Sequence, residues 1–128
     1  MNLWIDCDDT LALYCTTPDN PECEHDGVHP YGSQFSPYVP NYALIEGIKR
    51  FRRENPSARI IVWSGGGDWY ANTFVRQLLP TVWRVEVANK DHYTMLEVQE
   101  DDLVIDDMEI ATKWRHFFPN KLPEELRT

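Results

Sequence analysis

The sequence predicts an α/β fold in a single domain, residues 1–128, with a central parallel sheet covered by helices on both faces. Short apolar runs alternate with segments of helical periodicity along most of the chain. The apolar runs are uninterrupted, which is typical of strands buried on both sides of a parallel sheet. The length of 128 residues and the hydrophobic content of 42% suit one compact domain with its own core.

Five apolar segments are predicted to form the strands. The longest strongly apolar stretch reads IIVW at positions 60–63, which is far too short to span a bilayer. Each of the first four segments is followed by polar residues, so each strand is expected to end where these begin. The predicted strands cover residues 2–5, 59–63, 82–88 and 103–105, with a short fifth strand at 116–118.

Helices are predicted between these strands. The segment 42–53 gathers its apolar side chains on one face, whereas the basic residues of its KRFRR stretch, Arg52 among them, mostly turn away. We interpret this stretch as a solvent-exposed helix face and not as a nucleic-acid-binding patch. Pro56 and Pro80 are stop signals beyond the first two helices. The predicted helices cover residues 42–53, 68–79, about 92–99 and about 109–115.

One region, residues 15–40, is rich in proline and has no periodic apolar pattern, so it is predicted to be a long loop. It leaves the end of the first strand and is too short for a domain with its own core. We therefore expect a flap beside the site. Its Cys15, Cys23, His25 and His29 are of zinc-ligand type, but their spacing fits no standard finger, and a reduced polar loop is the alternative.

Polar residues follow the first four strands. Because ligands of parallel α/β sheets bind at the carboxyl ends of the strands, these residues are expected to meet at one edge. Clustered carboxylates call for a cation, and oxygen ligands without cysteine or histidine suit Mg²⁺. A glycine turn that leads into a helix offers backbone N–H groups to a phosphate. The strand ends read Asp6-Cys7-Asp8-Asp9-Thr10, Ser64-Gly65-Gly66-Gly67, Asn89-Lys90-Asp91 and Asp106-Asp107.

This set of residues predicts a site for both Mg²⁺ and a phosphoryl group, since a carboxylate can attack phosphorus to form an acyl-phosphate. The DCDDT stretch after the first strand resembles the DxDxT signature of the haloacid dehalogenase-like superfamily. Ser64, Lys90 and the Asp106-Asp107 pair resemble that family's second, third and fourth motifs, in the same order. The stretch WSGGGDWYA also resembles small members from bacteria and their phages that have no cap domain.

The resemblance implies a Rossmann-like three-layer α/β/α sandwich without a separate cap domain, and a Mg²⁺-dependent phosphatase. Asp6 would be the nucleophile and Asp8 the general acid and base. The metal would be held by Asp6, the Asp8 carbonyl and Asp106, with Asp107 beside or on it. Many members have glycine at the position of Asp9, whose side chain we expect to point outward. Phosphate-binding roles would fall to Ser64, Gly65 and Lys90, and Thr10 would fix the turn.

Several alternatives remain open. Ser64 alone could be a helix N-cap, and Arg84 or Lys113 could stand in for Lys90 as the site cation. A phosphoacceptor switch of the receiver type also uses aspartates, a hydroxyl and a lysine, but its motifs come in a different order. A phosphate-binding or regulatory protein that keeps the fold without turnover is the second rival to the enzyme.

The composition narrows the partners. A net charge of −9, with 12 lysines and arginines in all, argues against duplex DNA as a general partner. We expect a phosphorylated small molecule or a nucleic-acid end as substrate, no membrane association, and a monomer or small homo-oligomer. The N-terminus MNLWID lacks the basic region of a signal peptide, and three cysteines are an odd number. Both observations favour a cytoplasmic location.

Overall fold

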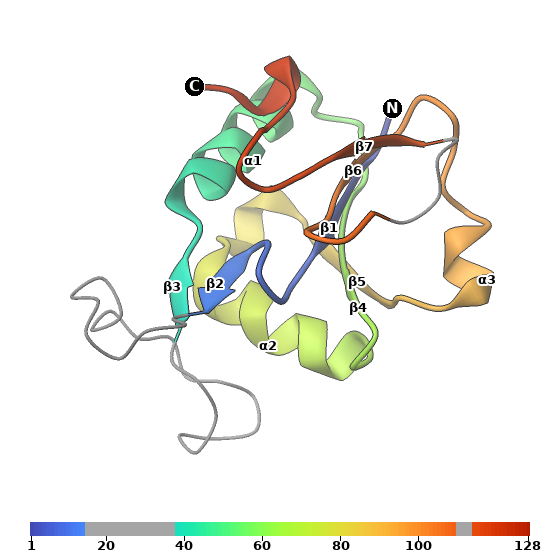
Figure 1. Cartoon of the computed structure of the whole chain (residues 1–128). Helices are drawn as coiled ribbons and strands as arrows, with labels where there is room; N and C mark the ends of the chain where they lie inside the picture. Colours follow the sequence, from blue (N-terminus) through green and yellow to red (C-terminus); the bar gives the residue numbers. More distant parts are fainter. Residues whose placement is uncertain (15–37, 110–113) are drawn as a thin grey trace.

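The apolar runs form a parallel sheet, as predicted. The structure is a computed structural model that describes residues 1–14, 38–109 and 114–128 (Figure 1). Its main sheet has the order β5-β4-β1-β6-β7, and every pair of neighbouring strands is parallel. The predicted α/β class is therefore confirmed. The strands are β1 (Leu3–Asp6), β4 (Ile60–Ser64), β5 (Glu86–Asn89), β6 (Leu103–Ile105) and β7 (Arg115–Phe117).

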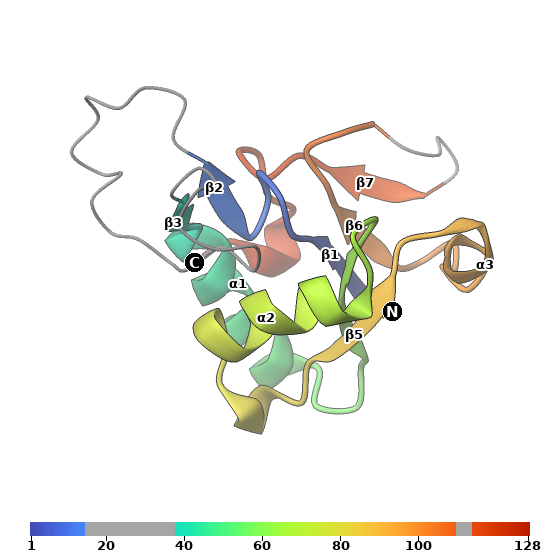
Figure 2. The same cartoon turned by 90° about the horizontal axis from the view of Figure 1, so that it is seen from below.

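Three α-helices lie against the sheet within the described residues: α1 (Tyr42–Glu54), α2 (Asp68–Leu78) and α3 (His92–Met95). Figures 1 and 2 show α1 and α2 on one face and the short α3 on the other. Strand side chains alternate between two cores accordingly. Leu3 and Ile5 pack towards α1 and α2, whereas Trp4 packs with Trp63 in the second core, under α3. The two faces therefore carry helical cover of unequal extent.

The bounds of most predicted elements are within one residue of the observed ones, but one strand and one helix differ by several residues. The strand predicted at 82–88 begins only at Glu86, because Thr81–Trp83 form a 3-10 turn (η2) and Arg84 adopts a left-handed φ of 55°. The helix predicted at 92–99 ends at Met95. Beyond it, the backbone N–H of Gln99 donates to the Asp102 carboxylate at 2.9 Å, which takes that group out of a helical pattern.

The prediction that Arg52 turns away from the core was wrong. Its side chain is buried, and its guanidinium donates to the carbonyls of Trp83, Asn55, Pro56 and Ala58 at 2.6–3.3 Å. A guanidinium has five N–H donors in a fixed fork, so one side chain can satisfy several carbonyls at once. Arg52 thus ties the end of α1 to η2.

The predicted loop at 15–40 was wrong at its C-terminal end. Tyr38–Pro40 form β3, which pairs antiparallel with β2 (Ala12–Tyr14). The four candidate zinc ligands, Cys15, Cys23, His25 and His29, lie outside the described residues. So does most of the helix predicted at 109–115, whose last residue, Arg115, instead begins β7. A strand near 116–118 is confirmed, one residue earlier than predicted.

The last described turn, η3 (Glu124–Leu126), packs on α1. Leu126 is fully buried, and a Cβ placed on Gly47 of α1 would overlap the Leu126 carbonyl. The absence of a side chain at Gly47 is what allows this approach. No helix among the described residues is long and apolar enough to cross a bilayer.

Candidate active site

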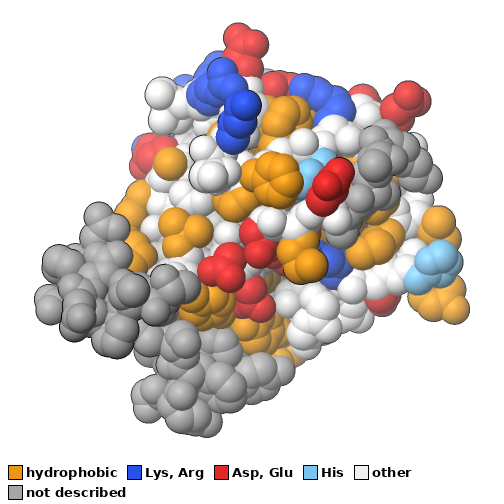
Figure 3. Space-filling view, in the orientation of Figure 1, with side chains coloured by type: hydrophobic (Ala, Val, Ile, Leu, Met, Phe, Trp, Pro, Cys, Tyr) orange, Lys and Arg blue, Asp and Glu red, His pale blue; other side chains and the backbone are white. Residues whose placement is uncertain are grey.

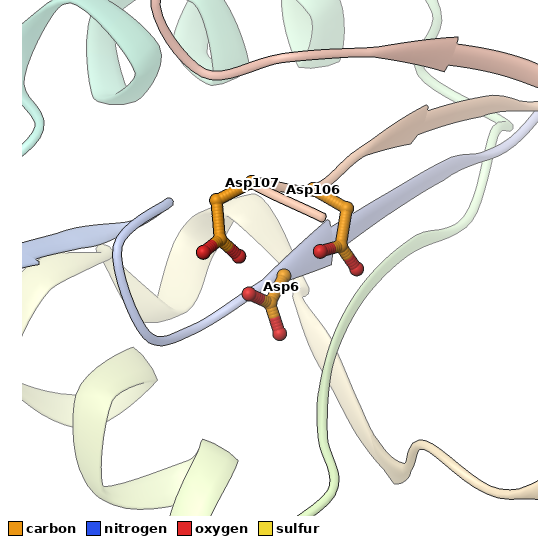
Figure 4. A group of neighbouring side chains, drawn as sticks. All are labelled: Asp6, Asp106 and Asp107. Carbon is orange, nitrogen blue, oxygen red and sulfur yellow. The ribbon is translucent and has the colours of Figure 1, made fainter. Parts of the chain in front are cut away.

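Four charged side chains from three strand ends converge at the carboxyl edge of the sheet. Asp6 ends β1, Lys90 follows β5, and Asp106 and Asp107 follow β6. The Nζ of Lys90 donates to Oδ1 of Asp6 at 2.5 Å and to Oδ2 of Asp106 at 2.7 Å. Figure 4 shows the three carboxylates turned towards one another. The sequence prediction that these residues meet at one edge is confirmed.

Burial shifts the pKa values of the charged side chains in this cluster. Asp6 and Asp106 are buried, and 15% of the Lys90 side chain is exposed. Burial raises the pKa of Asp6 to about 7; the attraction of Lys90 opposes this shift, and repulsion by Asp106 adds to it. Burial also raises the pKa of Asp107. For Lys90, burial lowers the pKa, but the contacts with Asp6 and Asp106 more than offset it and hold it above the usual value. One ammonium therefore leaves the carboxylates incompletely neutralised.

The carboxylates suit a hard divalent cation. One oxygen from each of Asp6, Asp106 and Asp107 lies within 4.8 Å of the others. Lys90 contacts Oδ1 of Asp6 and Oδ2 of Asp106. The second oxygens accept from the Thr10 hydroxyl at 3.3 Å and from the Met108 backbone N–H at 3.0 Å, so each has a further lone pair for a ligand. An all-oxygen donor set of this charge fits Mg²⁺, Mn²⁺ or Ca²⁺ better than a soft metal.

The turn after β1 is held by its own backbone. Three successive N–H groups, from residues 10–12, donate to the Cys7 carbonyl at 3.0–3.3 Å. The Thr10 hydroxyl donates to Asp6 at 3.3 Å and accepts from the backbone N–H of Asp107 at 3.1 Å. Thr10 thus joins the first acidic stretch to the last, in line with the role expected for it.

Asp9 is exposed and has a φ of 56°, in the left-handed region. Glycine adopts this backbone conformation most readily, and aspartate and asparagine tolerate it better than most other residues. The expected outward direction of its side chain agrees with its exposure. Its carboxylate accepts from the backbone N–H of Tyr14 at 3.3 Å.

Ser64 is buried at the end of β4, and its Oγ accepts from the backbone N–H of Gly66 at 3.0 Å. Its carbonyl accepts from the backbone N–H of Lys90 at 2.8 Å, so the second and third predicted motifs are joined directly. Gly67, with a φ of 108°, is the N-cap of α2. The alternative that Ser64 is the N-cap was therefore wrong. Gly65 is exposed, and a Cβ there would meet open space.

Lys90 is the site cation among the described candidates. Arg84 lies at the end of η2 and donates to the Pro56 carbonyl at 2.7 Å, away from the carboxylates. Lys113 lies outside the described residues.

The side chain of Asp8 is not part of the carboxylate cluster formed by Asp6, Asp106 and Asp107. Its Oδ1 accepts from the hydroxyls of Tyr14 and Tyr70, each at 2.7 Å. Sequence reasoning missed both tyrosines, because they have no motif spacing to the aspartates. Asn89 was expected among the strand-end residues but was given no role; its side chain accepts from the backbone N–H of Asp68 at 2.6 Å in the first turn of α2.

A groove of about 950 Å³ opens on one side of the cluster and reaches it at Asp107. Asp9 and Asp107 line this groove, and Leu13, Phe118 and Leu122 contribute apolar side chains. Figure 3 shows acidic side chains gathered near the middle of this face, with apolar side chains around them. The space is large enough for the organic part of a small substrate.

Three carboxylates and an ammonium thus meet at one edge of the sheet. The glycine turn follows the neighbouring strand β4, and the groove opens at Asp107. Such an arrangement can bind a phosphoryl group and present it to a carboxylate. Comparison of the chain with protein-family models, curated proteins and solved structures found no match.

Proposed function

We propose that this protein is a Mg²⁺-dependent phosphomonoester hydrolase of the haloacid dehalogenase-like type, acting through an aspartyl-phosphate on Asp6. The observation that carries the proposal is the position of Lys90, which contacts Asp6 and Asp106 at 2.5 and 2.7 Å beside a third carboxylate, Asp107. A solvated acidic turn would not need a partly buried ammonium shared between carboxylates that are 100 positions apart in the chain.

The first step is a displacement at phosphorus. A carboxylate oxygen of Asp6 attacks, a new O–P bond forms, and the bond from phosphorus to the leaving oxygen breaks. Asp8 gives its proton to the leaving oxygen. Lys90 stays beside Asp6 and offsets negative charge as the phosphoryl group transfers. Bound at Asp6, Asp106 and Asp107, Mg²⁺ would supply further positive charge and orient the phosphoryl oxygens.

The second step releases phosphate. Asp8, now ionised, takes a proton from water, whose oxygen attacks phosphorus. The O–P bond to Asp6 breaks, inorganic phosphate leaves, and both aspartates return to their starting states. The Oγ of Ser64 accepts from the backbone N–H of Gly66, a contact that does not use the hydroxyl proton. Ser64 can therefore donate that proton to the phosphoryl group.

The groove favours a compact leaving group such as a nucleoside. Phe118 is 44% exposed and offers a ring face or edge to a base, whereas Asp9 adds a negative charge to the groove. That charge repels a chain of phosphates more than a single one. We therefore place a nucleoside monophosphate ahead of a nucleic-acid end as the substrate.

The test is phosphate release from a panel of a chromogenic phosphomonoester, mononucleotides, sugar phosphates and oligonucleotides phosphorylated at either end. Release should require Mg²⁺, stop with chelator and be lost in Asp6→Asn. The matched control is Asp101→Asn, since the Asp101 side chain is 71% exposed and contacts the N-terminal amine. No release from any substrate by folded protein would overturn the enzyme and favour the phosphate-binding or regulatory alternative.

A further inference from the structure

Two tyrosines from separate elements share one carboxylate oxygen. Tyr14 ends β2 and Tyr70 lies in the first turn of α2, and each hydroxyl is 2.7 Å from Oδ1 of Asp8. The two hydroxyl oxygens are 3.3 Å apart. A phenol has a single proton, so each tyrosine satisfies the short contact by donating it to Asp8.

The hydroxyls of Tyr14 and Tyr70 both stay protonated, which is the form that donates a hydrogen bond. Burial raises the pKa of Tyr14 and of Tyr70 above the ordinary value, so each keeps its proton throughout the neutral range. The two donors therefore do not depend on pH where the enzyme would work.

Aromatic contacts fix where the two hydroxyls lie. The ring of Tyr14 packs edge-on against Tyr38 of β3, and the rings of Tyr38 and Tyr70 both pack edge-on against Phe74 of α2. Tyr38 and Phe74 are fully buried. Such packing locks rotamers and holds a polar group to a fraction of an ångström.

The two donors make the oxygens of Asp8 unequal. Oδ1 already accepts two hydrogen bonds, whereas no residue of the described ranges donates to Oδ2. When Asp8 is protonated, a proton on Oδ1 would face two other donors, so it belongs on Oδ2.

We propose that Tyr14 and Tyr70 are positioning residues that fix Asp8 through Oδ1, so that Oδ2 exchanges the proton with the leaving oxygen and then with water. The inference rests on the proposed function and deepens it. In the first step the Oδ2–H bond breaks as the leaving oxygen gains its proton. In the second step Oδ2 takes a proton from the attacking water.

The test uses Tyr14→Phe, Tyr70→Phe and the double variant, which keep the aromatic packing and remove only the hydroxyls. Each is compared on an alkyl phosphate, whose leaving oxygen needs a proton, and on p-nitrophenyl phosphate, whose leaving group does not. The matched control is Tyr93→Phe on α3, since Tyr93 is 79% exposed.

We expect the double variant to hydrolyse the alkyl phosphate about tenfold to a hundredfold more slowly, within the effect of a general acid. The pre-steady-state burst of nitrophenolate should change less than threefold, since that step needs no proton. In an Asp8→Asn background the tyrosine substitutions should have no further effect. Equal losses on both substrates, or undiminished losses in the Asp8→Asn background, would show that the tyrosines serve structure alone.

The outcomes for the inference and for the proposed function are distinct. If the wild-type protein releases no phosphate above the Asp6→Asn level, the proposed function fails and the inference fails with it. If the wild type is active and the tyrosine variants match Tyr93→Phe on the alkyl phosphate, the inference alone is overturned.

Discussion

The ammonium of Lys90 lies 2.5 Å from the carboxylate of Asp6, although the two residues are 84 positions apart in the chain. They meet because β1 and β5 are both parallel to β4, which separates them in the sheet. The fold therefore positions the Lys90 ammonium, and the ammonium in turn stabilises the fold by offsetting the buried negative charge of Asp6 and Asp106.

Lys90→Gln should weaken both folding and catalysis. Loss of the Lys90 ammonium leaves the carboxylates of Asp6 and Asp106 close together without a cation between them. We therefore expect the free energy of unfolding to fall by about 3 kcal/mol at pH 8 in the absence of metal. The effect should shrink at pH 5, because a carboxyl of pKa about 7 is then protonated. Urea unfolding at the two pH values measures this difference. Lys121→Gln, an exposed lysine, is the control, and an equal loss in both variants would contradict the prediction.

The metal-free protein should lose stability at Asp6 as pH rises. Its pKa is about 7 in the folded protein against an ordinary value of 3.8, so between these values the folded state binds more protons than the unfolded state. The free energy of unfolding contributed by this group therefore falls from about pH 4 to pH 7.

Asp6→Asn removes that dependence. With chelator present, the variant should unfold at a higher temperature than the wild type at pH 8 and at nearly the same temperature at pH 4. Thermal unfolding across this range is the measurement. Two curves of the same shape would show that Asp6 ionises as easily in the fold as in the unfolded chain.

Mg²⁺ should bind the three carboxylates and be sensed by Trp63, whose ring centre is 5.9 Å from the Nζ of Lys90. We expect Asp107→Asn to weaken binding about tenfold or more and Asp106→Asn to abolish it. Titration followed by tryptophan fluorescence gives the affinities, and the signal should disappear in Trp63→Phe while calorimetry still detects binding. Unchanged affinity in Asp106→Asn would place the metal elsewhere.

Gly47→Ala should destabilise the protein by about 1–3 kcal/mol, because the new Cβ would overlap the Leu126 carbonyl and push η3 from α1. Gly65→Ala is the matched control for stability, since a Cβ there meets open space. Denaturant unfolding of both variants measures the difference. Equal stabilities would mean that η3 moves aside without loss.

The central strands and the charged cluster could be predicted from the sequence. Strands β1, β4 and β6 are short apolar runs, buried on both faces, so composition alone marks them. Parallel pairing brings the residues at the ends of these strands and of β5 to one edge, which is why the sequence predicts that Asp6, Lys90 and Asp106 lie together.

Other features depend on contacts that no local pattern records. The start of β5 is set by the left-handed backbone of Arg84, although the residues before it read as a strand. Tyr70 meets Asp8 across 62 positions of the chain, through the packing of α2 on the sheet. Arg52 reads as one more basic residue of a helix, and only the carbonyls gathered around it explain its burial.

The left-handed backbone of Asp9 limits how this position can vary in evolution or in a library. Glycine, asparagine and aspartate can occupy a φ of 56° with little strain, whereas valine, isoleucine and threonine cannot. A saturation library selected for folded protein should therefore keep the first group and lose the second, whatever the charge at this position. Selection for activity would act on the same few survivors, so the charge at the edge of the groove can be tuned only by choosing among residues that the turn accepts.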